Sequence, residues 1–263
     1  MANRTIVLCA DDYGIAPGVS RGIRELIAAR RLSATSCIVV YPDFRDEGPK
    51  LAPYAGAIDV GLHVCLTHEQ PLWRVMRDAY LRMHDRAAIA AEVNRQLALF
   101  METMGRPPDY VDGHQHVHML PGVRETVCAI AERHGAWVRS LREPIATTLT
   151  RPAPIAATAL AQLGRPLANR LAARGIATNR GFRGTRRFVS GKPFRELMVA
   201  MLRGATDGTV VICHPGVSDA VLATRDAVTT TRDEELAYLA GDDFPCDLAA
   251  AGLVLGRLTA RAG

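Results

Sequence analysis

Acidic and imidazole side chains gather at the ends of short apolar runs in this sequence. Asp11 and Asp12 follow the apolar run at residues 6–8, after Cys9 and Ala10. Five of the eight histidines lie in compact motifs that also follow β-rich runs: His63, His114, His116, His118 and His214. Carboxylates and imidazoles placed together in this way are typical of metal-dependent hydrolases, in which they bind a metal ion and transfer protons.

The paired carboxylates allow two interpretations. In the first, one of the two carboxylates caps the helix expected after Pro17 or forms a turn, a role that requires only a single carboxylate. Neighbouring strand residues point in opposite directions, so one carboxylate could bind a metal ion while the other acts as a base. An ion held by one carboxylate and two neutral imidazoles keeps positions open for water and a carbonyl oxygen, and makes that water acidic enough to attack near neutral pH. This chemistry is amide or ester hydrolysis.

The motif DGHQHVH at residues 112–118 offers three alternating histidines. In an extended chain all three would share a face, whereas a helical turn would bring His114 and His118 together. The apolar helical pattern after Pro121 indicates that a helix begins nearby, which makes His114 the histidine closest to the strand end and the first choice as a ligand. His116 and His118 are expected to contact substrate or to form buried hydrogen bonds that support the ligands.

The late motif TVVICHPG at residues 209–216 carries His214 at the end of a strand-like run. Proline restricts the residue before it to extended conformations, so a rigid turn would aim this imidazole. Imidazole titrates near neutral pH, and His214 could therefore protonate a leaving amine as a general acid. A turn histidine that bonds to the backbone is the alternative.

Short β-branched runs and helical patterns alternate along the chain. Strands are expected in the runs 5–10, 35–41, 58–66, 110–112, 137–139 and 209–213. Apolar residues at spacings of three and four predict helices around residues 19–27, 89–100 and 123–131. This alternation favours a single α/β domain over residues 1–263, with a parallel sheet that is open or closed into a barrel. In such folds the site lies at the carboxyl ends of the strands.

Two segments look like additions to this framework. Residues 68–84 carry Trp73, Tyr80 and two methionines after a candidate site strand, and they could cover the substrate or pack on the core. Residues 144–179 are rich in Ala, Arg, Leu and Pro. They contain few large apolar residues for a core of their own, so we expect a helical insertion there.

Composition narrows the class of protein. A chain of 263 residues with 48% hydrophobic and 22% charged residues can bury a sizeable core. The N-terminal sequence has no signal-peptide pattern, and no apolar run approaches the roughly 20 residues of a membrane span. We therefore expect a soluble protein of the cytoplasm. The six cysteines are dispersed without a CxxC pair and are expected to be reduced. Cys9, Cys65 and Cys213 lie in apolar runs and are expected to be packed in apolar surroundings.

The net charge of +5 does not indicate nucleic acid binding, because the basic residues form no single face. Only two of the 32 are lysines, and the arginines are spread over the whole chain. One dense cluster, NRGFRGTRRF at residues 179–188, contains two glycines. It is expected to be a solvated loop or a contact for an anionic part of a substrate.

Four motifs together resemble the YdjC-like carbohydrate deacetylases, a family that includes chitooligosaccharide deacetylases and hopanoid-associated proteins. They are ADDYG at 10–14, GLHVCLT at 61–67, DGHQHVHMLPGV at 112–123 and CHPG at 213–216. The resemblance implies a deformed β/α barrel related to the NodB-like polysaccharide deacetylases. It also implies removal of an acetyl group, as acetate, from an N-acetylated sugar such as a chitooligosaccharide or a related glycan or glycolipid.

The resemblance assigns roles to individual residues. Asp12, His63 and His114 correspond to the metal ligands of the family. Asp11 corresponds to the base that activates water, and His214 to the acid. The family ion is usually assigned as magnesium or zinc. Two imidazoles favour zinc or another transition metal, because magnesium prefers oxygen ligands.

Other parts of the chain are also similar to the family or differ from it. Arg139 lies in a segment similar to one that carries an arginine near the family's site, so it could orient Asp11 through paired hydrogen bonds or be an ordinary surface arginine. The segment after GLHVCLT is shorter than in many relatives, which leaves the choice of sugar open. The form DGHQHVH favours the general carbohydrate branch over the hopanoid-linked one. Family habit implies a homodimer.

Two other functions are compatible with the same residues. Phosphoesterases also use clusters of imidazoles and carboxylates, but they commonly hold two or three ions. Only one full ligand set is evident here, although His116 and His118 could support a second ion. A sugar-binding relative without turnover would have lost a base or a ligand, and the motifs show no such loss.

Overall fold

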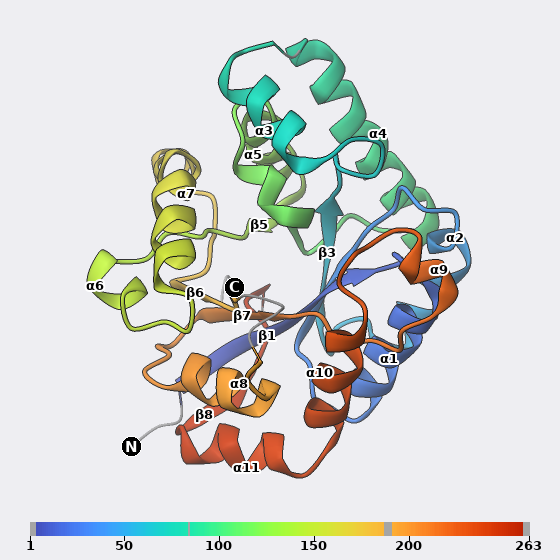
Figure 1. Ribbon diagram of the computed structural model, residues 1–263. Coiled ribbons are helices and arrows are strands. Elements are labelled where there is room, and N and C mark those ends of the chain that lie inside the picture. Colours follow the sequence, from blue (N-terminus) through green and yellow to red (C-terminus); the bar gives the residue numbers. More distant parts are fainter. Residues whose placement is uncertain (1–3, 84, 187–190, 260–263) are drawn as a thin grey trace.

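Figure 1 shows the computed structural model of the chain, which describes residues 4–83, 85–186 and 191–259. In this part of the chain, the strands form one parallel sheet in the order β5-β4-β3-β2-β1-β7-β6, and β8 pairs with the first residues of β1. The strands are β1 (Arg4–Tyr13), β2 (Ala34–Cys37), β3 (Asp59–Val64), β4 (Tyr110–Gly113), β5 (Trp137–Val138), β6 (Gly181–Arg183), β7 (Thr209–Cys213) and β8 (Leu253–Leu255).

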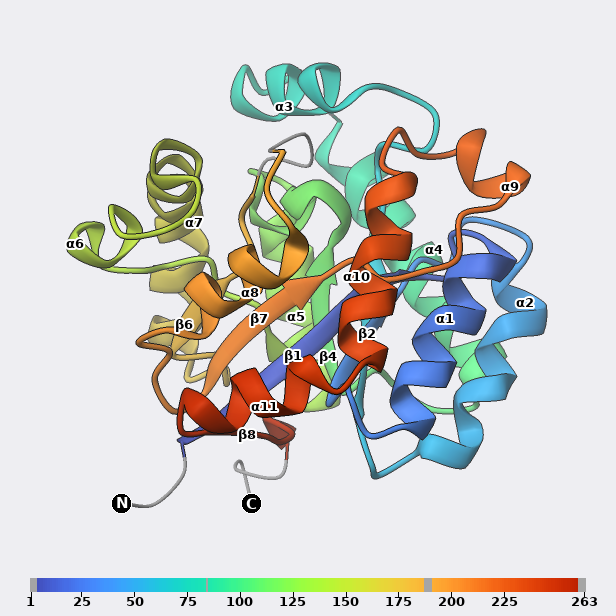
Figure 2. The ribbon, with the colours of Figure 1, turned by 60° about the horizontal axis from the view of Figure 1, so that its bottom comes forward.

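Helices connect these strands and pack around the outside of the curled sheet (Figure 2). The α-helices are α1 (Pro17–Ala28), α2 (Phe44–Glu47), α3 (Leu72–Tyr80), α4 (Arg86–Met104), α5 (Val123–His134), α6 (Ile145–Thr148), α7 (Pro154–Arg174), α8 (Phe194–Leu202), α9 (Ala220–Ala223), α10 (Thr230–Ala240) and α11 (Asp243–Ala250). Two 3-10 helices, η1 (Gly48–Tyr54) and η2 (His114–Met119), are also described. None of the described helices has both the length and the apolar character needed to cross a membrane.

The two edges of the sheet approach each other. A single parallel bridge joins Val138 on β5 to Thr178, three residues before β6. The backbone N–H of Val138 also donates to the carbonyl of Ala177 at 3.0 Å. The sheet is therefore a curled, irregular barrel, and the expected deformed β/α barrel in a single domain is confirmed.

The centre of the sheet is buried on both faces. Residues 6–10 of β1 are at most 2% exposed, as expected for a parallel strand covered by helices on both sides. The following helix, α1, begins at Pro17, a residue whose fixed φ suits the first helical position. Val19, Ile23 and Leu26 form its buried face. Apart from Ala157, Ala161 and Ala168 of α7, the buried apolar residues of the described chain join in one core cluster.

Most of the expected elements are present. The six predicted strand runs correspond to β1 to β5 and β7, and the three helical patterns fall within α1, α4 and α5. The expected helical insertion at 144–179 contains α6 and α7. In the 68–84 segment the chain forms α3, and His84 lies outside the described residues.

Other expectations were wrong. The strand predicted at 5–10 continues to Tyr13, so Asp11 and Asp12 lie within it. The arginine cluster is not a solvated loop throughout, because β6 runs through it and pairs with β7. Arg183 is buried, and its guanidinium donates to the carbonyls of Arg203 and Gly204. With only three residues each, β6 and β8 give no readable periodicity. Arg187 lies outside the described residues.

Candidate active site and metal centre

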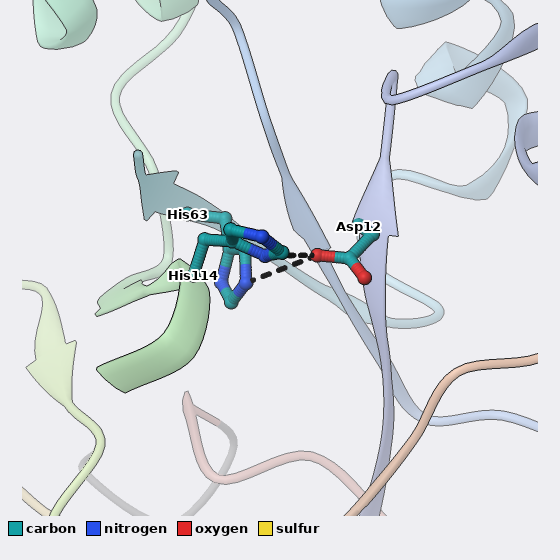
Figure 3. A group of neighbouring side chains, drawn as sticks. All are labelled: Asp12, His63 and His114. Carbon is teal, nitrogen blue, oxygen red and sulfur yellow. Dashed lines mark hydrogen bonds and ion pairs between the residues drawn. The ribbon is translucent and has the colours of Figure 1, made fainter. Parts of the chain in front are cut away.

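Three side chains from separate elements meet near the carboxyl ends of the strands. Asp12 lies near the end of β1, His63 lies in β3, and His114 begins η2 directly after β4. Oδ1 of Asp12 is 2.8 Å from Nδ1 of His114 and 3.4 Å from Nε2 of His63. Figure 3 shows both imidazoles converging on this carboxylate oxygen. The structure therefore brings together the three residues that were predicted as metal ligands.

The backbone of β1 explains how two neighbouring aspartates reach one cavity. Neighbouring residues of a regular strand point to opposite faces. Asp12 instead has a left-handed φ of 71°, and the pairing of β1 with β2 shifts in register between Ala10 and Tyr13. Such irregularities redirect side chains next to active sites. Asp11 and Asp12 consequently line the same cavity, and the expectation that they point in opposite directions does not hold.

Asp112 fixes the orientation of His63. Its Oδ1 accepts a hydrogen bond of 2.6 Å from Nδ1 of His63, which leaves Nε2 facing Asp12. Burial disfavours the imidazolium, but the nearby carboxylates, that of Asp112 foremost, outweigh burial and raise the pKa of His63 to about 10. A carboxylate behind a histidine is a common support for a metal-binding imidazole.

Arg232 on α10 holds the second oxygen of Asp12. Its Nη2 donates to Oδ2 of Asp12 at 2.7 Å and to Oδ2 of Asp226 at 2.6 Å. Burial favours the neutral acid, but His114 and Arg232 outweigh it and hold the pKa of Asp12 well below its usual range. Asp12 is therefore an ionised carboxylate with one oxygen tied to arginine and the other directed at the two imidazoles.

The donor atoms of Asp12, His63 and His114 suit one divalent metal ion. Bonds from zinc to nitrogen or oxygen are about 2.0–2.2 Å long, so two atoms bound to one ion lie about 3.0–3.5 Å apart. The separations of 2.8 and 3.4 Å from Oδ1 of Asp12 are close to this range. The donor atoms of all three residues lie within 4.8 Å of one another.

The charge around the site also suits a cation. In the described part of the chain, five carboxylates face three guanidinium groups here: Asp11, Asp12, Asp112, Asp226 and Glu235 against Arg139, Arg186 and Arg232. Metal binding requires neutral imidazoles, and with His63 and His114 deprotonated two negative charges are left in excess. Buried charge is costly unless it is compensated, and one divalent cation would compensate it.

A buried arginine holds Asp11. Nη1 of Arg139 donates to Oδ2 at 2.7 Å, and Nη2 donates to Oδ1 at 2.6 Å. Burial favours the neutral acid, but Arg139 outweighs it and holds the pKa of the Asp11 carboxyl well below its usual range. Arg139 is fully buried, so the alternative of a surface arginine is wrong. The paired hydrogen bonds keep Asp11 ionised and fix its orientation.

Asp112 connects this pair to the metal-ligand group. While its Oδ1 accepts from His63, its Oδ2 lies 2.6 Å from Nη2 of Arg139. The hydroxyl of Ser36 donates to the same Oδ2 at 2.6 Å. One buried carboxylate thus positions both a predicted metal ligand and the arginine that holds the predicted base.

Cys9, Asp11 and Asp112 form a second close group of potential ligand atoms. Arg139 already lies between them, with Nη2 3.1 Å from Sγ of Cys9 and 2.6 Å from both carboxylates. A metal ion there would have to displace a buried, permanently charged side chain. The thiol also contacts the Tyr110 hydroxyl at 3.0 Å, so Cys9 lies in a polar network and not in the apolar surroundings expected for it.

His214 directly follows β7 and lines the same cavity. Its backbone N–H donates to Oε2 of Glu235 at 2.6 Å, and Oε1 of that carboxylate pairs with Arg186. Burial lowers the pKa of His214 more than the surrounding carboxylates raise it, so the neutral imidazole is favoured.

The cavity at the site has a volume of about 290 Å³. Asp11, Asp12 and His214 form part of its polar floor, and Ala156 and Leu160 of α7 contribute to its wall. The cavity is therefore lined by both polar and apolar side chains, as in many small-molecule sites.

The other two histidines of the 112–118 motif have separate environments. His116 lines the cavity, with its ring edge-on to Phe182 at a centroid distance of 5.6 Å. Gln115 and His116 both have left-handed φ values, 51° and 63°, a conformation that costs energy for residues other than glycine. His118 is fully buried, and its Nε2–H donates to the carbonyl of Arg139 at 3.0 Å. Neither belongs to the close groups of potential ligands found among the described residues.

The motifs did not reveal every charged residue of the site. Arg232 and Glu235 lie three positions apart on α10, so they share one helix face, which turns toward the strand ends. Asp226 precedes the same helix. No local pattern distinguishes these residues from the other charged residues of a surface helix. Asp112, in contrast, stands inside the DGHQHVH motif, and its position directly before Gly113 and His114 was the available signal.

Residues 5–250 match the family described as YdjC-like protein. The chain belongs to the YdjC-like family. A curated relative of this YdjC-like chain, named chitooligosaccharide deacetylase, comes from Serratia marcescens. It is 26% identical over 270 aligned positions, which cover 96% of this chain and 97% of the relative. Similarity over nearly the full length supports a carbohydrate deacetylase.

Solved structures show the same fold for this YdjC-like chain. A protein from Enterococcus faecalis V583, named as a candidate cellobiose-phosphate cleavage protein, matches with a TM-score of 0.72 and 18% identity over 99% of both chains. A CE4 esterase from Streptococcus mutans matches with a TM-score of 0.51 and 13% identity, over 97% of this chain and 86% of that one. At these identities the likeness concerns the fold, which is that of the CE4 polysaccharide deacetylases.

Proposed function

We propose that this protein is a metal-dependent hydrolase that removes the acetyl group from an N-acetylated sugar. The observation that carries the proposal is the convergence of Asp12, His63 and His114 beside the arginine-held carboxylate of Asp11. The relative's name, chitooligosaccharide deacetylase, supports an N-acetylglucosamine oligomer or a related glycan as substrate.

Asp12, His63 and His114 would hold one divalent ion through the carboxylate Oδ1, Nε2 and Nδ1. A bound ion would polarise the acetamido carbonyl and make water more acidic. Two imidazole donors favour zinc or another transition metal over magnesium, which prefers oxygen ligands. Asp112 would keep the His63 ring in the orientation that presents Nε2 to the ion.

Asp11 would accept the proton of the attacking water. Both of its oxygens are bonded to Arg139, so the carboxylate is ionised and fixed before substrate arrives. Its low pKa makes it a weak base, and the proton would therefore pass on readily.

His214 would deliver a proton to the leaving nitrogen. Burial favours its neutral form, so the proton it donates must arrive during turnover. The proton that Asp11 takes from water is a source within the same cavity. The amine would then leave as a neutral group, and the enzyme would return to its starting protonation state.

The geometry gives less support to a phosphoesterase with two or three ions. Arg139 occupies the second group of potential ligands. In the described ranges His118 bonds to a backbone carbonyl and His116 packs against Phe182, and no carboxylate joins them in a ligand group. A sugar-binding protein without turnover is also less well supported, because the predicted base and the predicted acid both line the cavity.

The proposal is tested by acetate release from N-acetylglucosamine oligomers of different lengths, with a generic phosphoester measured in parallel. The protein is stripped of metal and reloaded with zinc, cobalt or magnesium. We expect acetate release that depends on the added metal and is fastest with a transition metal. Phosphate release without acetate release from any N-acetylated sugar would reject the proposal in favour of a phosphoesterase.

A further inference from the structure

Large apolar side chains are exposed in two short segments of the chain. All the exposed large apolar residues found in the described ranges lie there, with the exception of Val254. We call these residues the entrance surface: Trp73 (61% exposed), Tyr80 (43%), Leu81 (65%), Met83 (63%), Ile145 (52%), Leu149 (63%) and Ile155 (86%). Single exposed apolar residues are common on proteins, but groups of them mark interaction surfaces.

Both segments follow strands that carry or support site residues. The first follows β3, which carries His63, and contains α3. The second follows β5 and contains α6 and the start of α7. The carboxyl ends of parallel strands lie on one side of the sheet, and Ile155 directly precedes Ala156 of the cavity wall. In Figures 1 and 2 both α3 and α6 lie at the periphery of the molecule.

The helix α3 has two distinct faces. Val75 and Ala79 are buried against the protein. Trp73, Arg77 and Tyr80 are spaced four and three residues apart, so they share the outward face. The guanidinium carbon of Arg77 lies 5.5 Å from the centre of the Trp73 ring. An outward face that combines aromatic and basic side chains is typical of helices that lie at a membrane surface.

The second segment is held in place by partly buried polar contacts. The side chain of Arg151 donates to that of Glu143 at 2.7 Å, and the hydroxyls of Thr148 and Thr158 are 2.7 Å apart. These contacts tie α6 to the start of α7. The exposure of Ile145 and Ile155 therefore belongs to a fixed backbone, and the two side chains are available to a partner.

The charge of the entrance surface is positive. Residues 72–83 contain three arginines and one acid, Asp78, which is bonded to Arg77. Near the second segment, the side chain of Glu143 is already paired with Arg151, whereas Arg142 is exposed. Two copies of this surface would repel each other if they met face to face. An anionic lipid headgroup layer complements both the arginines and the apolar side chains.

We propose that the entrance surface docks onto an anionic lipid bilayer. Trp73, Leu81 and Ile155 enter the headgroup region, and the arginines of residues 72–83 contact lipid phosphates. Docking brings the mouth of the cavity to the bilayer surface. This inference goes beyond the proposed function, because it concerns a surface of the protein and does not depend on which bond the site cleaves.

The two tryptophans of the chain allow a direct test. Trp137 is buried and stacks on Tyr110 at a centroid distance of 4.1 Å, so a change in emission on adding vesicles reports Trp73. The full chain is mixed with vesicles of phosphatidylcholine alone or with added phosphatidylglycerol. We expect a blue shift and co-sedimentation with the anionic vesicles only, weakened in about 0.5 M salt, at which charges are screened within a few ångströms.

A matched pair of variants separates the entrance surface from exposed apolar residues in general. We expect Leu81→Ser combined with Ile155→Ser to weaken binding to anionic vesicles about tenfold or more, because two apolar side chains no longer leave water. Val254→Ser changes an exposed apolar residue outside the two segments and is expected to bind like the parent.

Three results would overturn the proposal. They are the absence of a Trp73 shift with anionic vesicles, equal loss of binding in Val254→Ser, and a blue shift that grows with protein concentration without vesicles. The last result would mean that a second copy of the chain covers the surface. None of these readouts involves turnover, so a failure of the proposed function would leave the docking result unchanged.

Discussion

The floor of the cavity and the entrance surface are built in opposite ways. The floor and the residues directly behind it are buried charged groups. Asp11 and His63 line the cavity, and behind them Asp11 contacts Arg139, Arg139 contacts Asp112 and Asp112 contacts His63, at 2.6–2.7 Å. The entrance surface consists of exposed apolar side chains and arginines on two segments that follow strands β3 and β5. The two regions suit different tasks. The fixed geometry of the floor suits a chemical reaction, and the exposed side chains of the entrance surface suit the recognition of a partner.

The largest expected effect concerns the base on the floor. Asp11→Asn removes the proton acceptor and leaves the buried guanidinium of Arg139 with one ionic partner fewer. We expect kcat to fall about 10³-fold, within the usual range for a general base, while bound metal per chain stays unchanged. The measurement is acetate release together with metal analysis of the purified variant. A variant with near-parental kcat would show that the arginine-held carboxylate is structural.

The next effect concerns the pH dependence of stability that is expected from the buried His118. Burial lowers the pKa of His118 to about 4, below the value of about 6.5 in an unfolded chain. Between these values the unfolded state binds more protons, so stability is lost as the pH falls from about 6.5 toward 4, by up to about 3 kcal/mol. In His118→Gln this loss should be smaller by that amount. Urea unfolding of both proteins across this pH range measures it, and parallel curves would contradict the burial argument.

A smaller effect is expected from the carboxylate that connects the two halves of the floor. Asp112→Asn weakens the support of His63 and of Arg139, and we expect metal affinity to fall about 10–100-fold. High metal concentration should restore metal occupancy. Asp46→Asn, at an exposed position on α2, serves as the control and should bind metal like the parent. Unchanged affinity in Asp112→Asn would mean that the two halves of the floor are independent.

The smallest effects are expected at the entrance surface. Trp73→Ser and Ile155→Ser remove exposed side chains, so the free energy of unfolding should change by no more than about 0.5 kcal/mol. Acetate release from a short, water-soluble oligomer should also stay near the parental rate. A large loss of stability in either variant would show that these side chains pack in the folded protein, and the contrast between floor and entrance would then fail.

The sequence predicted the parts of the site that lie in motifs. Strand runs with β-branched residues located β1, β3, β4 and β7, and parallel strands place their carboxyl ends together, so Asp12, His63, His114 and His214 could be expected at one edge. The family motifs supplied the proposed roles.

Other parts could not be predicted, because they depend on packing between distant segments. The left-handed backbone at Asp12 cannot be predicted from the residue type alone, because aspartate tolerates this conformation but rarely adopts it. This backbone determines that both aspartates face the cavity. Arg232 and Glu235 reach the site from α10, about 220 residues after β1, as ordinary members of a polar helix. No sequence pattern indicates that Arg139 is buried, because its partners Asp11 and Asp112 are distant in the sequence.

The most direct test of the central claim is a zinc titration of the metal-stripped protein, followed by acetate release. We expect activity to rise to a plateau at one zinc per chain, to stay near zero in His63→Ala, and to follow the parental titration in His116→Ala, which changes a histidine of the same cavity outside the ligand group. Full activity of the stripped protein, or a parental titration in His63→Ala, would contradict the assignment of Asp12, His63 and His114 as the metal centre.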